Sequence, residues 1–117
     1  MAFFSEYFNV SLATIHIPVN KVSKSISKEL IIQQIDIINN FLKNYLKKKT
    51  PNIGICGLNP HASEDGNIGT EDLSIIAPAL KVLKKKGIAI NGPYPADTIF
   101  VESNRKEFDM IHANYHD

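Results

Sequence analysis

The sequence predicts an α/β protein with a mostly parallel sheet and flanking helices. Short apolar runs rich in β-branched residues alternate with helical patterns along the chain, in the order β-α-β-α-β-α-β. The length of 117 residues suits one domain around a single core. We expect right-handed crossovers between the parallel strands. Because the strands are parallel, their carboxyl ends lie at the same edge of the sheet. We therefore expect the polar residues that follow the strands to meet at that edge.

Charge and composition exclude several classes of partner. Lys and Arg total 13 against 12 for Asp and Glu, so there is no net field that attracts nucleic acid or an acidic membrane. No run approaches the length of a membrane span, and the N-terminus lacks the pattern of a signal peptide. The single cysteine, Cys56, lies in an apolar run, which predicts a buried inert thiol and a reducing compartment. We expect a cytoplasmic protein.

The first half of the chain predicts a strand, a long helix and a second strand. Residues 9–17 alternate and contain β-branched residues, which places His16 near the carboxyl end of a strand. A helix over 27–48 follows, capped by Ser25 or Ser27. Its apolar stripe consists of Leu30, Ile31, Ile35, Ile38, Leu42 and Tyr45. Residues 53–56 are almost wholly apolar, as in a strand buried on both faces.

A second helix is predicted after the polar loop 57–70. Thr70 is a good N-cap, and Glu71 and Asp72 lie in the first turn, where the helix dipole favours negative charge. Gly87 ends this helix. Its buried side is expected to contain Leu73, Ile76, Ala77, Leu80 and Leu83. Pro78 lies inside the helix and predicts a kink, because proline removes a backbone hydrogen bond.

The last third predicts two more strands around a short helix. Residues 88–90 form the third strand, and the loop 91–95 leads to a helix over 96–101. The last strand spans 108–114. No internal repeat or linker divides the chain, so residues 1–117 are treated as one unit.

The loop 57–70, GLNPHASEDGNIGT, is the main candidate site. Ligands bind at the carboxyl ends of strands in open α/β sheets, and loops this long are more often functional than idle. Pro60 stiffens the backbone before His61, and imidazole is a common ligand of zinc and other transition ions. His116, after the last strand, can add a second nitrogen. Solvent-exposed or hydrogen-bonding histidines fit the same spacing.

Several other polar residues allow two interpretations. Glu64 and Asp65 suit metal ligation or the orientation of an imidazole, and equally the formation of turns. Asp97 can cap the short helix or contact a substrate. His112 lies within a strand and is expected to be structural, whereas His16 is a further candidate for the site. Neither the P-loop pattern nor GxGxxG is present.

Together, several motifs resemble a known family. LATIHIP, GLNPHASEDGNIGTE, NGPYPADTIF and NYHD, in this order, resemble the 4-hydroxythreonine-4-phosphate dehydrogenase family of pyridoxal 5'-phosphate biosynthesis. The resemblance covers nearly all of the chain. It implies part of a fold like that of isocitrate and isopropylmalate dehydrogenases, with two α/β domains and an active site at a homodimer interface. Residues 1–117 are then a single α/β fragment of a larger two-domain enzyme.

The same resemblance implies a reaction and a set of residues. The family oxidises a small phosphorylated hydroxy amino acid, 4-hydroxythreonine 4-phosphate, with NAD or NADP, and the product decarboxylates to 3-amino-2-oxopropyl phosphate. A divalent metal (Zn, Mg or Co) held by three histidines polarises the substrate. By motif, His61 and His116 match two metal ligands, and the third is expected upstream of this chain. Asp117 and Asp97 match acidic residues of the site and are the predicted catalytic residues.

The family's phosphate-binding segments are not found in these 117 residues, so we expect the chain alone to be inactive. The cofactor-binding residues are not assigned. A non-catalytic α/β binding or assembly module left from such an enzyme is the alternative interpretation. A relative that acts on another phosphorylated hydroxy acid is a third.

Overall fold

The structure, a computed structural model, describes residues 1–116 and confirms the α/β class. One five-stranded sheet has the order β1-β2-β5-β3-β4. Its strands are Ala2–Phe3 (β1), Val10–Leu12 (β2), Asn52–Cys56 (β3), Ala89–Tyr94 (β4) and Met110–Ala113 (β5). β2, β5, β3 and β4 are mutually parallel, and β1 pairs antiparallel with β2. The parallel strands therefore end at one edge, as predicted.

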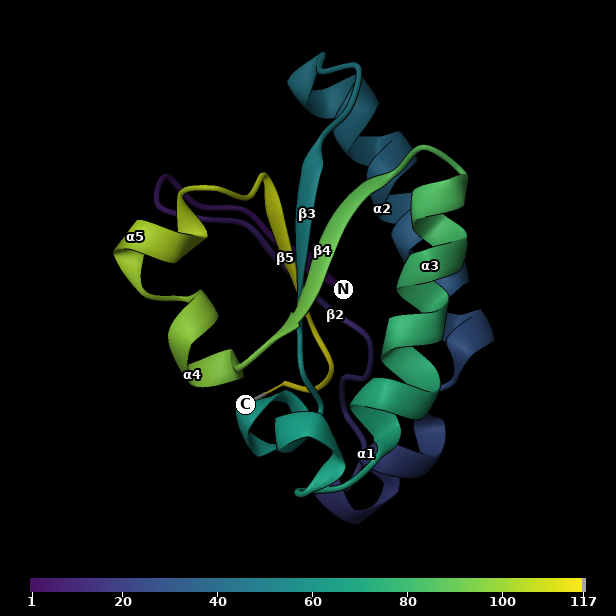
Figure 1. The fold of residues 1–117 in the computed structure, drawn as a ribbon. Helices are drawn as coiled ribbons and strands as arrows, with labels where there is room; N and C mark the ends of the chain where they lie inside the picture. Colours follow the sequence, from purple (N-terminus) through teal and green to yellow (C-terminus); the bar gives the residue numbers. More distant parts are fainter. Residues whose placement is uncertain (117) are drawn as a thin grey trace.

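Helices lie on both faces of the sheet. The long α2 (Lys28–Leu46) and α3 (Ala77–Lys85) cover one face, and the short α4 (Ala96–Ile99) and α5 (Glu102–Arg105) lie on the other (Figure 1). A further helix, α1 (Val19–Ser25), connects β2 to α2. Within residues 1–116, no helix combines the length and apolar character needed to span a membrane.

The main core lies between the sheet and the pair α2 and α3. Its fully buried side chains include Ile31, Ile35, Leu42, Ile53, Ile55, Ile76, Leu83, Ile90 and Met110. A smaller cluster on the other face contains Cys56, Ile99 and Ile111. β3 supplies side chains to both clusters because its residues alternate between the faces, which confirms that this strand is buried on both sides.

The helix predicted over 27–48 is confirmed as α2. Ser27 is the N-cap, and its hydroxyl accepts the N–H of Leu30 at 3.1 Å. Tyr45, however, is 58% exposed, so its predicted burial was wrong. Its ring packs against Phe4 and Phe41 instead, with centroids 5.2 and 5.6 Å away. Periodicity places a residue on a helix face, but burial also requires another element opposite it.

The first strand is shorter than the predicted 9–17. β2 ends at Leu12, and His16 lies beyond the strand on an exposed segment. Backbone bonds to the partner segment continue a little further, from Ala13 N–H to Ala113 at 2.8 Å and from Thr14 N–H to Asn114 at 3.2 Å, and residues 15–17 beyond them are exposed. β1, α1 and α5 were not predicted.

The helix after the loop begins with an irregular turn. A π-helical turn, Asp72–Ile76 (η2), precedes α3 and has no side-chain cap. Thr70 lies at the predicted N-cap position, because helical residues begin at Glu71 and the carbonyl of Thr70 accepts the N–H of Ser74 at 2.8 Å. Pro78 lies in the first turn of α3, where its missing N–H is tolerated. Leu73 is 49% exposed, against its predicted burial. The wider turn departs from the 3.6-residue period, and Asp72 takes the fully buried position instead.

β4 extends through the predicted loop 91–95 as far as Tyr94 and contains a cis peptide between Gly92 and Pro93. The carbonyl of Tyr94 accepts the N–H of Gly57 at 2.7 Å, which fixes the first residue of the polar loop.

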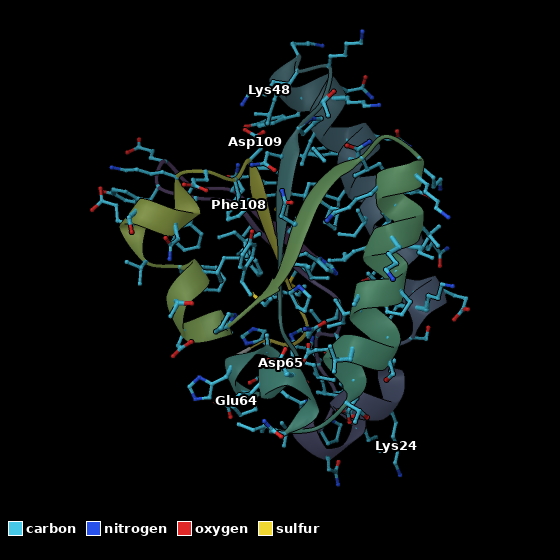
Figure 2. All side chains as sticks on the ribbon, viewed as in Figure 1. Lys24, Lys48, Glu64, Asp65, Phe108 and Asp109 are labelled. Atoms are coloured by element: carbon cyan, nitrogen blue, oxygen red, sulfur yellow. The ribbon has the colours of Figure 1, made fainter. Side chains whose placement is uncertain are left out.

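At the opposite edge, Asp109 contacts Lys48 at 2.6 Å (Figure 2). Asp109 also accepts the N–H of Asn52 at 2.8 Å. Hydrogen bonds therefore fix β3 at both of its ends, through Asn52 at the start and Gly57 just after the end.

Candidate functional site

The candidate residues lie along the carboxyl edge of the sheet. His61 and Asp97 line a cavity of about 280 Å³, and His116 lines another of about 520 Å³. Residues shared by the two linings are Gly57, Ala96 and Tyr115, so the cavities adjoin. Figure 1 shows the segment that follows β5 beside the turn after β3 and beside α4. Asp117, the other predicted catalytic residue, lies outside the described residues.

The larger cavity has mostly apolar walls, which include Phe3, Phe8 and Phe100. Cys56 also lines it, and burial raises the pKa of this thiol to about 12. The predicted burial of this thiol is confirmed, and the raised pKa disfavours the reactive thiolate. The amide nitrogen of Asn114 donates to the carbonyl of Cys56 at 2.8 Å. This cavity can shield a ligand from water but has few polar groups to bind one.

His16 lies beside His116 at this edge. Their ring centroids are 6.2 Å apart and both residues are exposed. Because a zinc–nitrogen bond is about 2.0–2.1 Å long, small side-chain rotations let two imidazoles at this separation reach one ion. No group of three His, Cys, Asp or Glu side chains suited to a metal gathers within residues 1–116. The described chain therefore offers an imidazole pair rather than a complete metal site.

His61 lies on a left-handed helical turn within Pro60–Gly66 (η1). Consecutive residues have positive φ: His61 53°, Ala62 51°, Ser63 70°, Glu64 43° and Asp65 55°. None of them is glycine, and each L-residue in this region costs about 1–2 kcal/mol. Over the whole run the strain is roughly 5–10 kcal/mol. The turn persists only if its surroundings compensate for this strain.

A buried carboxylate anchors the turn. Asp72 accepts the N–H of Leu58 at 2.6 Å, the N–H of Asn59 at 3.1 Å and the hydroxyl of Ser63 at 2.6 Å. Ser63 and Asp72 are both fully buried. The side chain of Asn59 donates to Ser63 at 3.1 Å and to Glu71 at 2.7 Å. The hydrogen bond from Asn59, with bonds from backbone N–H groups, holds the pKa of Glu71 below its usual range.

Two glycines allow the close approach of this network. A Cβ at Gly57 would lie 2.8 Å from Cα of Ala62, which is a backbone atom that cannot move aside easily. At Gly69, where φ is +80°, a Cβ would lie 2.6 Å from the amide nitrogen of Asn59. A side chain at Gly57 would displace the backbone of the turn that carries His61, and one at Gly69 would displace the Asn59 side chain that bonds to Ser63.

The remaining polar candidates separate into two groups. Glu64 and Asp65 are exposed on the left-handed turn (Figure 2), where they form the turn and lie outside the residues that line the site cavities. His112 is fully buried in β5, and its Nδ1 lies 2.9 Å from the hydroxyl of Ser11. Burial lowers its pKa to about 4. The structural role predicted for His112 is confirmed.

The sequence did not reveal three features of this edge: the left-handed turn, the anchoring role of Asp72 and the pairing of His16 with His116. Asp72 was assigned to the helix dipole, because acidic residues are common in a first turn. The paired glycines 57 and 69 around a polar loop were the available signal for close packing.

Comparison with known proteins identifies relatives for the whole chain. The family model described as pyridoxal phosphate biosynthetic protein PdxA matches residues 1–117. A 4-hydroxythreonine-4-phosphate dehydrogenase from Pseudoalteromonas atlantica is 45% identical over 113 residues, which are 97% of this chain and 35% of the relative. One from Wigglesworthia glossinidia brevipalpis is 47% identical over 108 residues, 92% of this chain and 32% of the relative.

Solved structures agree with the family match. The 4-hydroxythreonine-4-phosphate dehydrogenase of Klebsiella pneumoniae has a TM-score of 0.92 and 33% identity, over 99% of this chain and 35% of that one. A terephthalate 1,2-cis-dihydrodiol dehydrogenase from Burkholderia xenovorans has a TM-score of 0.85 and 25% identity, over 95% and 35%. The prediction that this chain forms part of a fold like that of isocitrate and isopropylmalate dehydrogenases is confirmed. The chain spans about a third of the length of these relatives, and it belongs to the family of pyridoxal phosphate biosynthetic protein PdxA.

Proposed function

We propose that this chain supplies part of the active site of an NAD- or NADP-dependent dehydrogenase that oxidises 4-hydroxythreonine 4-phosphate in the cytoplasm. The observation that carries the proposal is the position of His61, Asp97 and His116 on adjoining cavities at one sheet edge. Membership of the family supports this substrate and reaction. The neighbour named for a terephthalate dihydrodiol shows that the shared fold alone does not determine the substrate.

The chain's own imidazoles are suited to a divalent transition metal. The rings of His16 and His116 lie 6.2 Å apart, and His61 lines the adjoining cavity at the same edge. Nitrogen ligands favour zinc or cobalt over magnesium, which prefers oxygen. In this proposal His16 takes the place of the histidine expected upstream. A bound ion would supply Lewis-acid polarisation of a substrate oxygen.

Other residues of the edge bind and orient the substrate. Asp97 is exposed on the same cavity as His61, where its carboxylate can accept a hydrogen bond from a substrate hydroxyl or ammonium group. Its alternative role as a helix cap is not seen, because α4 has Pro95 as N-cap and no side-chain cap. The assignment of Asp117 as a catalytic acid remains a prediction. The apolar walls of the larger cavity limit the access of water.

The site needs further groups for the phosphate. Within residues 1–116, no Lys or Arg lines either cavity, so the negative charge of a phosphorylated substrate has no cationic partner here. We propose that other segments of the enzyme and a second subunit complete the site. The same observation favours the alternative, a non-catalytic binding or assembly module, when the chain acts alone.

A zinc titration tests the proposal. Wild type, His16→Ala, His61→Ala and His116→Ala are compared by calorimetry, with Lys106→Ala as the control. Lys106 forms an exposed ion pair with Glu102 and lines neither cavity. We expect the three histidine variants to bind zinc more weakly than wild type and the control to match it. Equal affinity in all five proteins would remove the metal site from this proposal.

A further inference from the structure

The left-handed turn needs an explanation that its own residues do not provide. Apart from the glycine and proline at its ends, it consists of residues that prefer the right-handed region, yet φ is positive from His61 to Asp65. Backbone hydrogen bonds also join the turn to the residues beside it: Ala62 N–H to Asn59, Asn67 N–H to Glu64 and Ile68 N–H to Ser63. Because these residues prefer the right-handed region, contacts from outside the turn must favour the left-handed conformation.

The imposing group is the carboxylate of Asp72, on the π-helical turn that follows. It receives the N–H groups of Leu58 and Asn59, just before the turn, and the hydroxyl of Ser63, in its middle. These bonds hold the residues before and after His61 to the same carboxylate. The carboxylate is fully buried, and no ion pair involves it within the described chain. Its charge is stabilised by these hydrogen bonds, so they are strongly favoured.

The imidazole lies between the two anchors. Pro60 and His61 are exposed, whereas Ser63, two residues later, is fully buried. This alternation turns the His61 side chain outward into the cavity that it shares with Asp97. A right-handed turn at the same place would carry the side chain of Ser63 away from Asp72 and rotate the imidazole with it.

We propose that Asp72 is a positioning residue, which holds the left-handed turn through Leu58, Asn59 and Ser63 and so presents His61 to the site. Asp72 does not contact the substrate or the metal. The functional consequence for His61 rests on the metal site proposed above, but the conformational claim does not.

Nuclear magnetic resonance of the labelled chain tests both parts. Asp72→Asn keeps the shape of the side chain but replaces one acceptor oxygen with a donor, and Ser63→Ala removes only one hydroxyl. Ser74→Ala is the control, because Ser74 is exposed on the same π-helical turn. Three-bond HN–Hα couplings and carbon shifts of residues 61–65 report the sign of φ. Zinc-dependent shifts of the His61 ring report its availability to a metal.

We expect Asp72→Asn and Ser63→Ala to lose the positive φ values and to weaken the zinc response of His61 by about 10–100-fold, as for other groups that orient a ligand. The control should retain both. Positive φ across residues 61–65 in Asp72→Asn, or in Ser63→Ala if the first variant does not fold, would overturn the proposal. The coupling measurement needs no metal. If the wild-type chain binds no zinc, the proposed metal site is refuted, but the couplings still test whether Asp72 holds the left-handed turn.

Discussion

Acidification is predicted to destabilise the protein through His112. Its ring is fully buried, and its Nε2 has no hydrogen-bond partner. Burial is the main cause that lowers its pKa from 6.5 to about 4, and the positive charge of the N-terminus adds to the effect. The His112 ring of the folded protein therefore stays neutral at pH values where the same ring in the unfolded chain is already protonated.

The sign and size of the effect follow from these two pKa values. The unfolded state binds more protons between pH 6.5 and about 4, so the free energy of unfolding falls as the pH is lowered through that range. The gap is about 2.5 pH units, and one unit corresponds to about 1.4 kcal/mol, which gives a loss of about 3 kcal/mol. Above pH 6.5 the contribution is fully present.

Urea unfolding at a series of pH values measures this loss. The comparison protein is the double variant Ser11→Ala/His112→Leu, which removes both partners of the buried hydrogen bond and leaves neither polar group orphaned. Carboxylates such as Glu71 titrate in both proteins, so the difference between the two pH profiles isolates His112. If the free energy of unfolding falls equally in wild type and in the double variant between pH 6.5 and about 4, His112 is not the cause of the loss.

Three further predictions concern packing and activity. Leu42→Ala, at a fully buried site, should lower the free energy of unfolding by about 2–5 kcal/mol, whereas Leu73→Ala, at a half-exposed site, should change it by less than about 1 kcal/mol. Similar losses in urea unfolding would contradict the observed orientation of the π-helical turn. Gly57→Ala should destabilise by about 1–3 kcal/mol, because its Cβ meets the backbone of Ala62, with Ser74→Ala as the unaffected control. The purified 117-residue chain should produce no NADH or NADPH from 4-hydroxythreonine 4-phosphate and a divalent ion, because its cavities lack a phosphate partner; steady cofactor reduction would disprove this.

The fold was predictable where local pattern and global packing agree. The stripe of α2 and its Ser27 cap, the doubly buried β3 and the parallel edge all follow from residue periodicity. The strand predicted over 9–17 was too long, because alternation persists in the sequence beyond Thr14, where the structure shows backbone bonds to the partner segment at Asn114. Tyr45 and Leu73 were placed in the core because periodicity does not reveal where a neighbouring element is missing or a helix turn is widened.

The candidate site was predictable in its location but not in its construction. Topology brings His61, Asp97 and His116 to one edge, and this depends only on the order of strands. The conformation of residues 61–65 depends instead on hydrogen bonds to Asp72, a residue that follows the loop. No local propensity favours such a run in the left-handed region, so long-range hydrogen bonding decides it. Topology also predicted His16 at the same edge as His116, but the separation of 6.2 Å between their ring centroids appears only in three dimensions.

The most direct test of the central claim is a chimeric enzyme. Residues 1–117 replace the matching third of the Pseudoalteromonas atlantica 4-hydroxythreonine-4-phosphate dehydrogenase, and reduction of NAD or NADP is followed with the substrate and zinc. We predict measurable turnover that is lost in the His116→Ala and His61→Ala chimeras and retained in the Lys106→Ala chimera. A folded chimera without turnover, or one whose turnover survives both histidine substitutions, would contradict the claim that this chain forms part of the dehydrogenase site.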